Sequence, residues 1–218
     1  MTLAIFDLDH TLLNGDSDHA WGQYLVDRQL VDAELHQRRN DEFYQQYQNG
    51  DLDIHQYLQF ALAPLTQYPK QQMEDERQRF LQQRIEPMIS QKSLQLIDHH
   101  KQAGHQLLII TATNGFVTYP IAKRLGIEHI IAPHPEQQDG QYTGRIVGIP
   151  SFQHGKVTRL HQWLEQQQCD LQGSYFYSDS HNDLPLLREV EHPVAVDPDD
   201  KLRQEAQQQG WDIISLRD

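Results

Sequence analysis

Cysteine is almost absent from this sequence, since Cys169 is the only one among 218 residues. No intramolecular disulfide can form, which fits a reducing compartment such as the cytoplasm. The sequence also lacks any apolar run close to the roughly 20 residues that a membrane-spanning helix needs. Its N-terminus has no basic region followed by an apolar stretch, the pattern of a signal peptide. We therefore expect a cytoplasmic protein with no membrane partner.

Positive charge is scarce as well. The chain has 18 Lys and Arg against 31 Asp and Glu, which gives a formal net charge of -13. Phosphate backbones and anionic lipids repel such a chain, so nucleic acid is not an expected partner. If the substrate is an anion, a metal ion or local basic side chains must overcome the field of the whole protein. A chain of this length forms one domain or two small ones.

The hydrophobic pattern predicts an α/β fold with a helical insertion. Residues 3–8, LAIFDL, are typical of a buried strand. From residue 16 to about residue 88, apolar residues recur at spacings of three and four, which indicates helices. After residue 88, strands and helices alternate, which predicts a parallel sheet covered on both faces. We predict strands at 105–111, 129–132, 174–178, 192–196 and 211–215, helices near 91–103, 116–125, 155–168 and 182–189, and a hairpin around 136–144.

Polar side chains follow three of the predicted strands. The adjacent carboxylates of Asp7 and Asp9 repel each other, so they either cap the helix that follows or hold a cation. The carboxyl ends of parallel strands meet at one edge, where ligands bind in open α/β sheets. Oxygen ligands without cysteine favour Mg²⁺, and a lysine binds phosphate as a point charge. The polar residues expected at this edge are Asp7, Asp9, Thr11, Thr111, Thr113, Lys156, Ser178, Asp179, Ser180, Asn182 and Asp183.

Four segments of the chain resemble the four motifs of the haloacid dehalogenase superfamily. They are DLDHT, LLIITAT, HGKVTRL and YSDSHNDLPLL, and together they span nearly the whole chain. Their order and spacing resemble the phosphoserine-phosphatase-like branch, in which a helical cap separates the first two motifs. The resemblance implies a Rossmann-like parallel sheet flanked by helices, formed by residues 1–15 and 89–218. It also implies an inserted α-helical cap domain over residues 16–88.

The resemblance implies a phosphoric monoester hydrolase that uses Mg²⁺ and an aspartyl-phosphate intermediate. Asp7 corresponds to the nucleophile, and Asp9 corresponds to the general acid and base. The side chain of Asp7, the main-chain carbonyl of Asp9 and the side chain of Asp179 would hold Mg²⁺. Asp183 would support the metal or its waters, although an acidic residue that only stabilises a helix N-terminus is an alternative for Asp183.

The same resemblance implies a phosphate-binding set. Thr111 and Lys156 would hold the phosphoryl oxygens, and Asn182 would contact the phosphate. The ordinary alternatives are a solvated helix lysine for Lys156 and a strand residue for Thr111. The fourth motif departs from the family pattern, because Ser178 stands where the family usually has glycine before the aspartate.

The cap sequence bears on the substrate. Asp16 and Asp18 are candidates to face the substrate, although Asp16 also fits a helix N-cap. Trp21 either stacks on a substrate ring or belongs to the cap core. Residues 40–69 contain no Lys or Arg, whereas phosphoserine phosphatases bind the substrate carboxylate with a cap arginine; Arg38 and Arg39 are the nearest candidates.

An amine-bearing phosphate without a carboxylate therefore fits this cap better than phosphoserine. The segments GDSDHAWG, RRNDEFY and DIHQYLQFALAPL also resemble bacterial histidinol-phosphate phosphatases of the same branch. We therefore predict hydrolysis of a small phosphorylated metabolite, L-histidinol phosphate, by a monomer or a homodimer. Phosphoserine phosphatase or another small-metabolite phosphatase is the alternative. A phosphotransferase or a phosphate-binding protein without turnover would belong to a different class.

Overall fold

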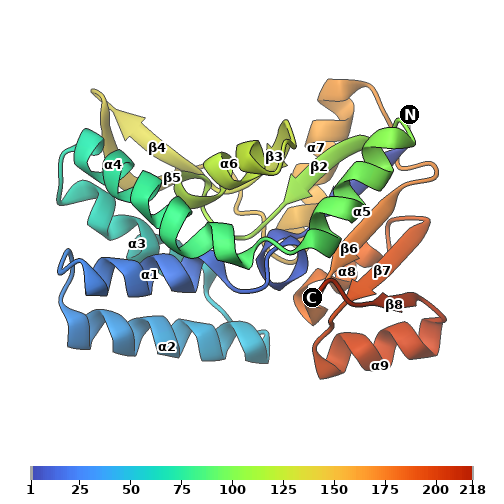
Figure 1. The fold of residues 1–218 in the computed structure, drawn as a ribbon, viewed down its shortest axis with the longest axis horizontal. Coiled ribbons are helices and arrows are strands. Elements are labelled where there is room, and N and C mark those ends of the chain that lie inside the picture. The colour runs from blue at the N-terminus through green and yellow to red at the C-terminus, as the bar shows by residue number, and fades with distance from the viewer. Residues whose placement is uncertain (1, 218) are drawn as a thin grey trace.

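A six-stranded parallel sheet forms the centre of the protein. The computed structural model describes residues 2–217. The strand order is β3-β2-β1-β6-β7-β8, and each neighbouring pair is parallel (Figure 1). The predicted α/β fold is thus confirmed. The strands are β1 (Leu3–Phe6), β2 (Gln106–Ile110), β3 (His129–Ile131), β6 (Tyr175–Ser178), β7 (His192–Val196) and β8 (Asp212–Ile214).

Helices cover both faces of this sheet. Successive side chains of a strand point to opposite faces, so Leu3 and Ile5 join one apolar cluster while Ala4 and Phe6 join the other. Helices α7, α8 and α9 contribute to the first cluster, and α5 and α6 contribute to the second. The bounds are α5 (Gln91–Gln102), α6 (Gly115–Arg124), α7 (His154–Gln167), α8 (Leu184–Leu187, preceded by the short turn η5, His181–Asp183) and α9 (Asp200–Gln209).

The segment between β1 and α5 is helical, as the pattern predicts. Its helices gather on one side of the molecule, beside the sheet (Figure 1). Aspartate side chains cap three of them, because Asp16, Asp32 and Asp53 each accept hydrogen bonds from main-chain amides of the first turn. The elements are the irregular turn η1 (Leu8–Leu12), α1 (Ser17–Asp27), α2 (Ala33–Asn49), α3 (Ile54–Leu62), η2 (Ala63–Thr66), α4 (Lys70–Phe80), η3 (Leu81–Ile85) and η4 (Glu86–Met88).

The predicted hairpin is present, and it packs against the cap helices. Strands β4 (His134–Gln138) and β5 (Gln141–Val147) are antiparallel, and β5 contacts α3 and η2. Asp139 and Gly140 both have positive φ, as a tight two-residue hairpin turn requires. Lys70 of α4 also donates to the Gln137 side chain at 2.9 Å. The hairpin, although distant in sequence from the cap helices, therefore packs beside them.

The two chain segments that join the cap to the sheet lie side by side. The amide of Asn14 donates to the carbonyl of Met88 at 2.7 Å, and Leu13 forms a bridge with Ile89. On this basis we propose the predicted division into a sheet domain of residues 1–15 and 89–218 and a cap domain of residues 16–88.

Among residues 2–217, no helix is both long and apolar enough to cross a membrane.

Trp21 lies in the core between the cap and the sheet. It is 2% exposed, and its ring packs against Tyr24, Phe80 and Phe116 with centroid distances of 5.5, 5.1 and 5.6 Å. Tyr24 and Phe80 belong to the cap, whereas Phe116 lies in α6 beside the sheet. Of the two predictions for Trp21, the core residue is therefore the correct one.

Trp21→Ala should lower the free energy of unfolding by about 3–5 kcal/mol, because it leaves a large cavity in this core. Chemical denaturation measures the loss. Leu35→Ala is the control, since Leu35 is 54% exposed and its truncation should change stability by no more than about 0.5 kcal/mol. A variant of Trp21 with normal stability and a raised KM would instead indicate substrate stacking.

Candidate active site

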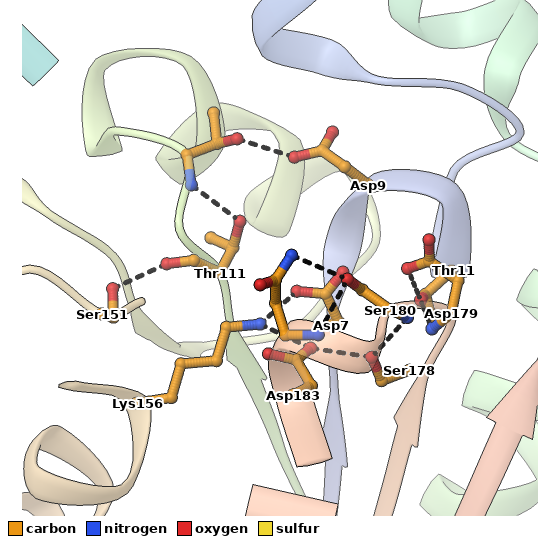
Figure 2. Close-up of polar contacts among 12 residues, drawn as sticks. Asp7, Asp9, Thr11, Thr111, Ser151, Lys156, Ser178, Asp179, Ser180 and Asp183 are labelled. Carbon is orange, nitrogen blue, oxygen red and sulfur yellow. Dashed lines mark hydrogen bonds and ion pairs between the residues drawn. The ribbon is translucent and has the colours of Figure 1, made fainter. Parts of the chain in front are cut away.

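The strand register brings the predicted polar residues to one edge of the sheet. Phe6 of β1 pairs with Ile109 of β2 and with Tyr177 of β6. The residues just beyond these strands therefore lie close together, and they include Asp7, Thr111 and Asp179. Figure 2 shows these side chains converging on the carboxyl edge.

Lys156 connects two carboxylates at this edge. Its Nζ lies 2.6 Å from Oδ1 of Asp7 and 2.8 Å from Oδ2 of Asp183 (Figure 2). Lys156 is 3% exposed, so the alternative of a solvated helix lysine is wrong. The hydroxyl of Ser178 donates to the same oxygen of Asp183 at 2.7 Å. The serine that departs from the family pattern thus supplies a hydrogen bond that glycine could not.

Negative charge exceeds positive charge among these groups. Burial raises the pKa of Asp7 to about 7; Lys156 opposes this shift, while the charges of Asp183 and Asp9 add to it. Burial also raises the pKa of Asp179 well above its usual range, with further contributions from Asp7 and Asp183. Burial disfavours the charge on Lys156, but the two carboxylates outweigh it and raise the pKa of this lysine. One ammonium group does not neutralise the cluster, so a further cation fits here.

The donor set at this edge suits Mg²⁺. Thr11 donates to Oδ1 of Asp179 at 3.0 Å and fixes that carboxylate near Asp7 (Figure 2). Within residues 2–217, no three His, Cys, Asp or Glu side chains form a metal cage by themselves. Mg²⁺ needs no such cage, because it commonly takes one or two carboxylates and completes its octahedron with other oxygens and water. Asp7, Asp179 and the carbonyl of Asp9 remain the predicted ligands.

Asp9 is held by two hydrogen bonds beside Asp7. The amide of Ser17 donates to its Oδ1 at 2.6 Å, and the hydroxyl of Thr113 donates to its Oδ2 at 2.7 Å. Burial and the charge of Asp16 raise the pKa of Asp9 to about 6, against the effect of these hydrogen bonds. A carboxyl group with such a pKa is suited to giving and taking a proton near neutral pH.

Thr111 is buried next to this pair of aspartates. Its hydroxyl accepts from the amide of Thr113 at 3.1 Å, and its carbonyl accepts from the hydroxyl of Ser151 at 2.6 Å. These contacts fix the turn after β2. The hydroxyl retains its own proton to donate, which suits the predicted phosphate contact.

Asn182 lies where the sheet domain meets the cap. Its Nδ2 donates to the carbonyl of Tyr47 in α2 at 3.0 Å, and its Oδ1 accepts from Gln153 at 3.0 Å. Gln153 also donates to the carbonyl of Gly50 at 3.2 Å. The structure therefore gives Asn182 a role in holding the end of α2, and its contact with phosphate stays a prediction.

A cavity leads from Asp7 into the cap. Its empty volume, including the open mouth, is about 620 Å³. None of the described residues that border it is Lys or Arg. Arg38 and Arg39 pair instead with Glu42 on α2. The polar and aromatic residues that border the cavity are Asp7, Asp9, His10, Asp16, Asp18, His19, Asn40, Phe43, Tyr44, Tyr47, Tyr57, Thr111 and Thr113.

The two acidic cap residues have different environments within this cavity. Asp16 accepts from the amides of Asp18 and His19 at 2.9 and 2.8 Å, so the predicted N-cap is present. Asp18 is 6% exposed, and it accepts from the hydroxyl of Tyr57 at 2.5 Å and from Asn114 at 3.4 Å. Burial, followed by the charges of Asp16 and Asp9, raises the pKa of Asp18 to about 7 against the effect of Tyr57.

Several residues of the site were not identified from the sequence. They come from cap helices or from turns beside the motifs, where no spacing rule points to the cavity. Asn114 stands directly after the second motif, and its position there is the one signal that could have indicated it. The others are Ser151, Gln153, Tyr47 and Tyr57.

Asp18→Asn should stabilise the protein at pH 8 but not at pH 4. The folded protein keeps the Asp18 proton up to about pH 7, whereas the unfolded chain releases it near pH 4. The stability from this proton is complete below about pH 4 and is lost as pH rises through 7. The gain at pH 8 should be about 2–4 kcal/mol in chemical denaturation. Asp32→Asn, at the exposed start of α2, should show no comparable gain, and an equal effect of Asp18→Asn at both pH values would contradict the prediction.

Comparison with known sequences places the chain in a family. The model of the haloacid dehalogenase-like hydrolases matches residues 4–188. A histidinol-phosphatase from Neisseria meningitidis serogroup C is 48% identical over 219 positions, which cover 99% of each chain. A phosphoserine phosphatase from Mycobacterium tuberculosis is 30% identical over 98% of this chain and 70% of its own length.

Solved structures agree in fold. A protein of unknown function from Bordetella pertussis Tohama I superposes over the full length of both chains with a TM-score of 0.93 and 42% identity. A phosphoserine phosphatase with an analogue of its phospho-aspartyl intermediate has a TM-score of 0.70 and 18% identity, over 99% of this chain and 93% of its own. The expected family and the expected class of phosphoric monoester hydrolase are thus confirmed. The chain belongs to the haloacid dehalogenase-like hydrolases.

Proposed function

We propose that this protein is a Mg²⁺-dependent phosphatase that hydrolyses L-histidinol phosphate through an aspartyl-phosphate on Asp7. The observation that carries this proposal is the cavity between Asp7 and the cap, which is acidic and aromatic and is bordered by no Lys or Arg among the described residues. L-Histidinol phosphate has an amine and an imidazole but no carboxylate. The full-length similarity to a protein named histidinol-phosphatase supports the same substrate.

In the first step, Asp7 attacks the phosphorus atom of the ester. A bound Mg²⁺ would offset the charge of the phosphoryl oxygens and of the carboxylates around them. Lys156 contacts Oδ1 of Asp7 at 2.6 Å, so it orients the nucleophile and offers a positive charge to the phosphoryl group. The bond between phosphorus and the ester oxygen breaks, and Asp9 gives its proton to the leaving alkoxide.

In the second step, water attacks the phosphorus of the aspartyl-phosphate. Asp9, now ionised, accepts the proton of this water, the bond between phosphorus and Asp7 breaks, and inorganic phosphate leaves. The pKa of about 6 for Asp9 suits both roles, because neither protonation state is strongly disfavoured near neutral pH. Thr111 would donate its hydroxyl hydrogen to a phosphoryl oxygen in both steps.

The charge of the cavity argues against phosphoserine. A substrate carboxylate that enters this cavity would lose its hydration beside Asp16 and Asp18 without gaining a cationic partner. The positively charged amine of histidinol phosphate would instead gain a carboxylate partner in this cavity. The rings of Phe43, Tyr44 and Tyr47 offer an apolar and aromatic wall to the imidazole.

Asp7→Asn should lower turnover by at least about 10⁴-fold, because the amide cannot form the aspartyl-phosphate. The protein should remain folded, since the change removes one of several crowded carboxylates and Lys156 retains its ion pair with Asp183. Phosphate release and chemical denaturation measure the two effects. Asp53→Asn, at the exposed start of α3, should retain wild-type activity. Near-normal turnover of purified Asp7→Asn protein would exclude the mechanism.

The kcat/KM for L-histidinol phosphate should exceed that for phosphoserine by at least about tenfold, because a mispaired buried charge costs a few kcal/mol. Both substrates are measured under one condition with Mg²⁺, and alcohol acceptors are added in a parallel series to detect phosphotransfer. Equal values, or a preference for phosphoserine, would show that a basic side chain such as Arg38 or Arg39 reaches the substrate.

A further inference from the structure

Asp18 is a buried carboxyl group that borders the cavity and has no cationic partner among residues 2–217. It lies in the first turn of α1 and is 6% exposed. Tyr57 of α3 donates to its Oδ2 at 2.5 Å, and Asn114, just before α6, donates to its Oδ1 at 3.4 Å. Among residues 2–217, no Lys, Arg or His pairs with it. Neutral donors orient this carboxylate, but they leave its charge uncompensated.

The other carboxylates of the cavity differ from Asp18 in this respect. Asp7 has the ammonium of Lys156 at 2.6 Å. Asp16 is the N-cap residue of α1, where its carboxylate accepts from two main-chain amides and is stabilised by the positive end of the helix. Asp9 uses both of its oxygens on Ser17 and Thr113. Asp18 is therefore the carboxylate whose charge a cationic group of the substrate would neutralise.

A second observation points to a ligand with several hydrogen-bond donors. Asn114 is 1% exposed, and its Oδ1 is buried without a partner in residues 2–217. This oxygen belongs to the same amide group that donates to Asp18. A buried acceptor without a partner is costly. A primary ammonium carries three donors, so it could serve the carboxylate and still have hydrogens for a neighbouring oxygen.

We propose that Asp18, oriented by Tyr57 and Asn114, binds the primary ammonium of the substrate and makes the enzyme selective for amine-bearing phosphate esters. This inference rests on the proposed function, because the amine it assigns is that of histidinol phosphate. It gives Asp18 and Asp16 different roles, because Asp16 stabilises the N-terminus of α1 and does not bind the amine. It also makes Tyr57 a positioning residue, since its hydroxyl acts on the substrate only through Asp18.

The test compares two ligands that differ only in the amine. They are L-histidinol phosphate and 3-(imidazol-4-yl)propyl phosphate, which keeps the imidazole and the phosphate. The inhibition constant of each against hydrolysis of p-nitrophenyl phosphate is measured, together with its own kcat/KM. The wild type should favour the amine-bearing ligand by about 10²-fold, because a site built for a hydrogen-bonding group strongly rejects an analogue without it.

Three variants separate the roles. Asp18→Asn keeps the shape of the side chain, and it should reduce the preference for the amine to less than about threefold through KM, with the values for the amine-free ligand almost unchanged. Asp16→Asn should keep the preference, because asparagine also caps helices. Tyr57→Phe should reduce the preference partly and through KM, because phenylalanine no longer orients Asp18.

The outcomes distinguish this inference from the proposed function. A preference for the amine that survives in Asp18→Asn, or that Asp16→Asn removes instead, would overturn the role of Asp18. An equal loss for both ligands in Asp18→Asn would also overturn it, since that result indicates a structural role. Poor turnover of histidinol phosphate relative to phosphoserine would refute the proposed substrate. The inhibition constants would still decide whether Asp18 binds the amine.

Discussion

The contact of Lys156 with Asp7 and Asp183 is the interaction on which the rest of the site depends. It joins β1, the start of α7 and the turn after β6 through one buried ammonium group. Each of these charges is costly in a buried position, and loss of Lys156 would leave the carboxylates of Asp7 and Asp183 without a cation, at a cost of about 3–5 kcal/mol. The lysine therefore fixes the geometry of the sheet edge and at the same time lowers the negative charge around Asp7.

The remaining excess of negative charge divides the cavity into two parts. At the sheet edge, the carboxylates of Asp7 and Asp179 suit a divalent cation and a phosphoryl group. At the cap end of the same cavity, Asp18 suits an organic cation. Contacts from Asn182 and Gln153 to the end of α2 hold these two parts together. This division would let an acidic protein bind the proposed anionic ester, with Mg²⁺ at the sheet edge and the amine of the substrate at Asp18.

Much of the fold and the site followed from the sequence, because both depend on local periodicity and strand order. Alternating strands and helices imply a parallel sheet, and its carboxyl ends bring Asp7, Thr111 and Asp179 together whatever the details of packing. The contact between Tyr57 and Asp18 could not be predicted in this way. It joins α3 to α1, and helical spacing defines a buried face without fixing which side chains of two helices meet. The packing of β5 on the cap could not be predicted either, because it depends on contacts between segments distant in sequence.

In the proposed mechanism, the phosphoryl group is transferred to Asp7, and Asp9 gives and takes the proton. Asp9→Asn protein with p-nitrophenyl phosphate tests it most directly, because this leaving group needs no proton from Asp9 while hydrolysis of the intermediate does need Asp9. After an acid quench, one phosphoryl group per chain should be found on the peptide that contains Asp7, and hydroxylamine should release it. Phosphate on a histidine, or steady hydrolysis with no phosphate bound to the protein, would exclude transfer through Asp7.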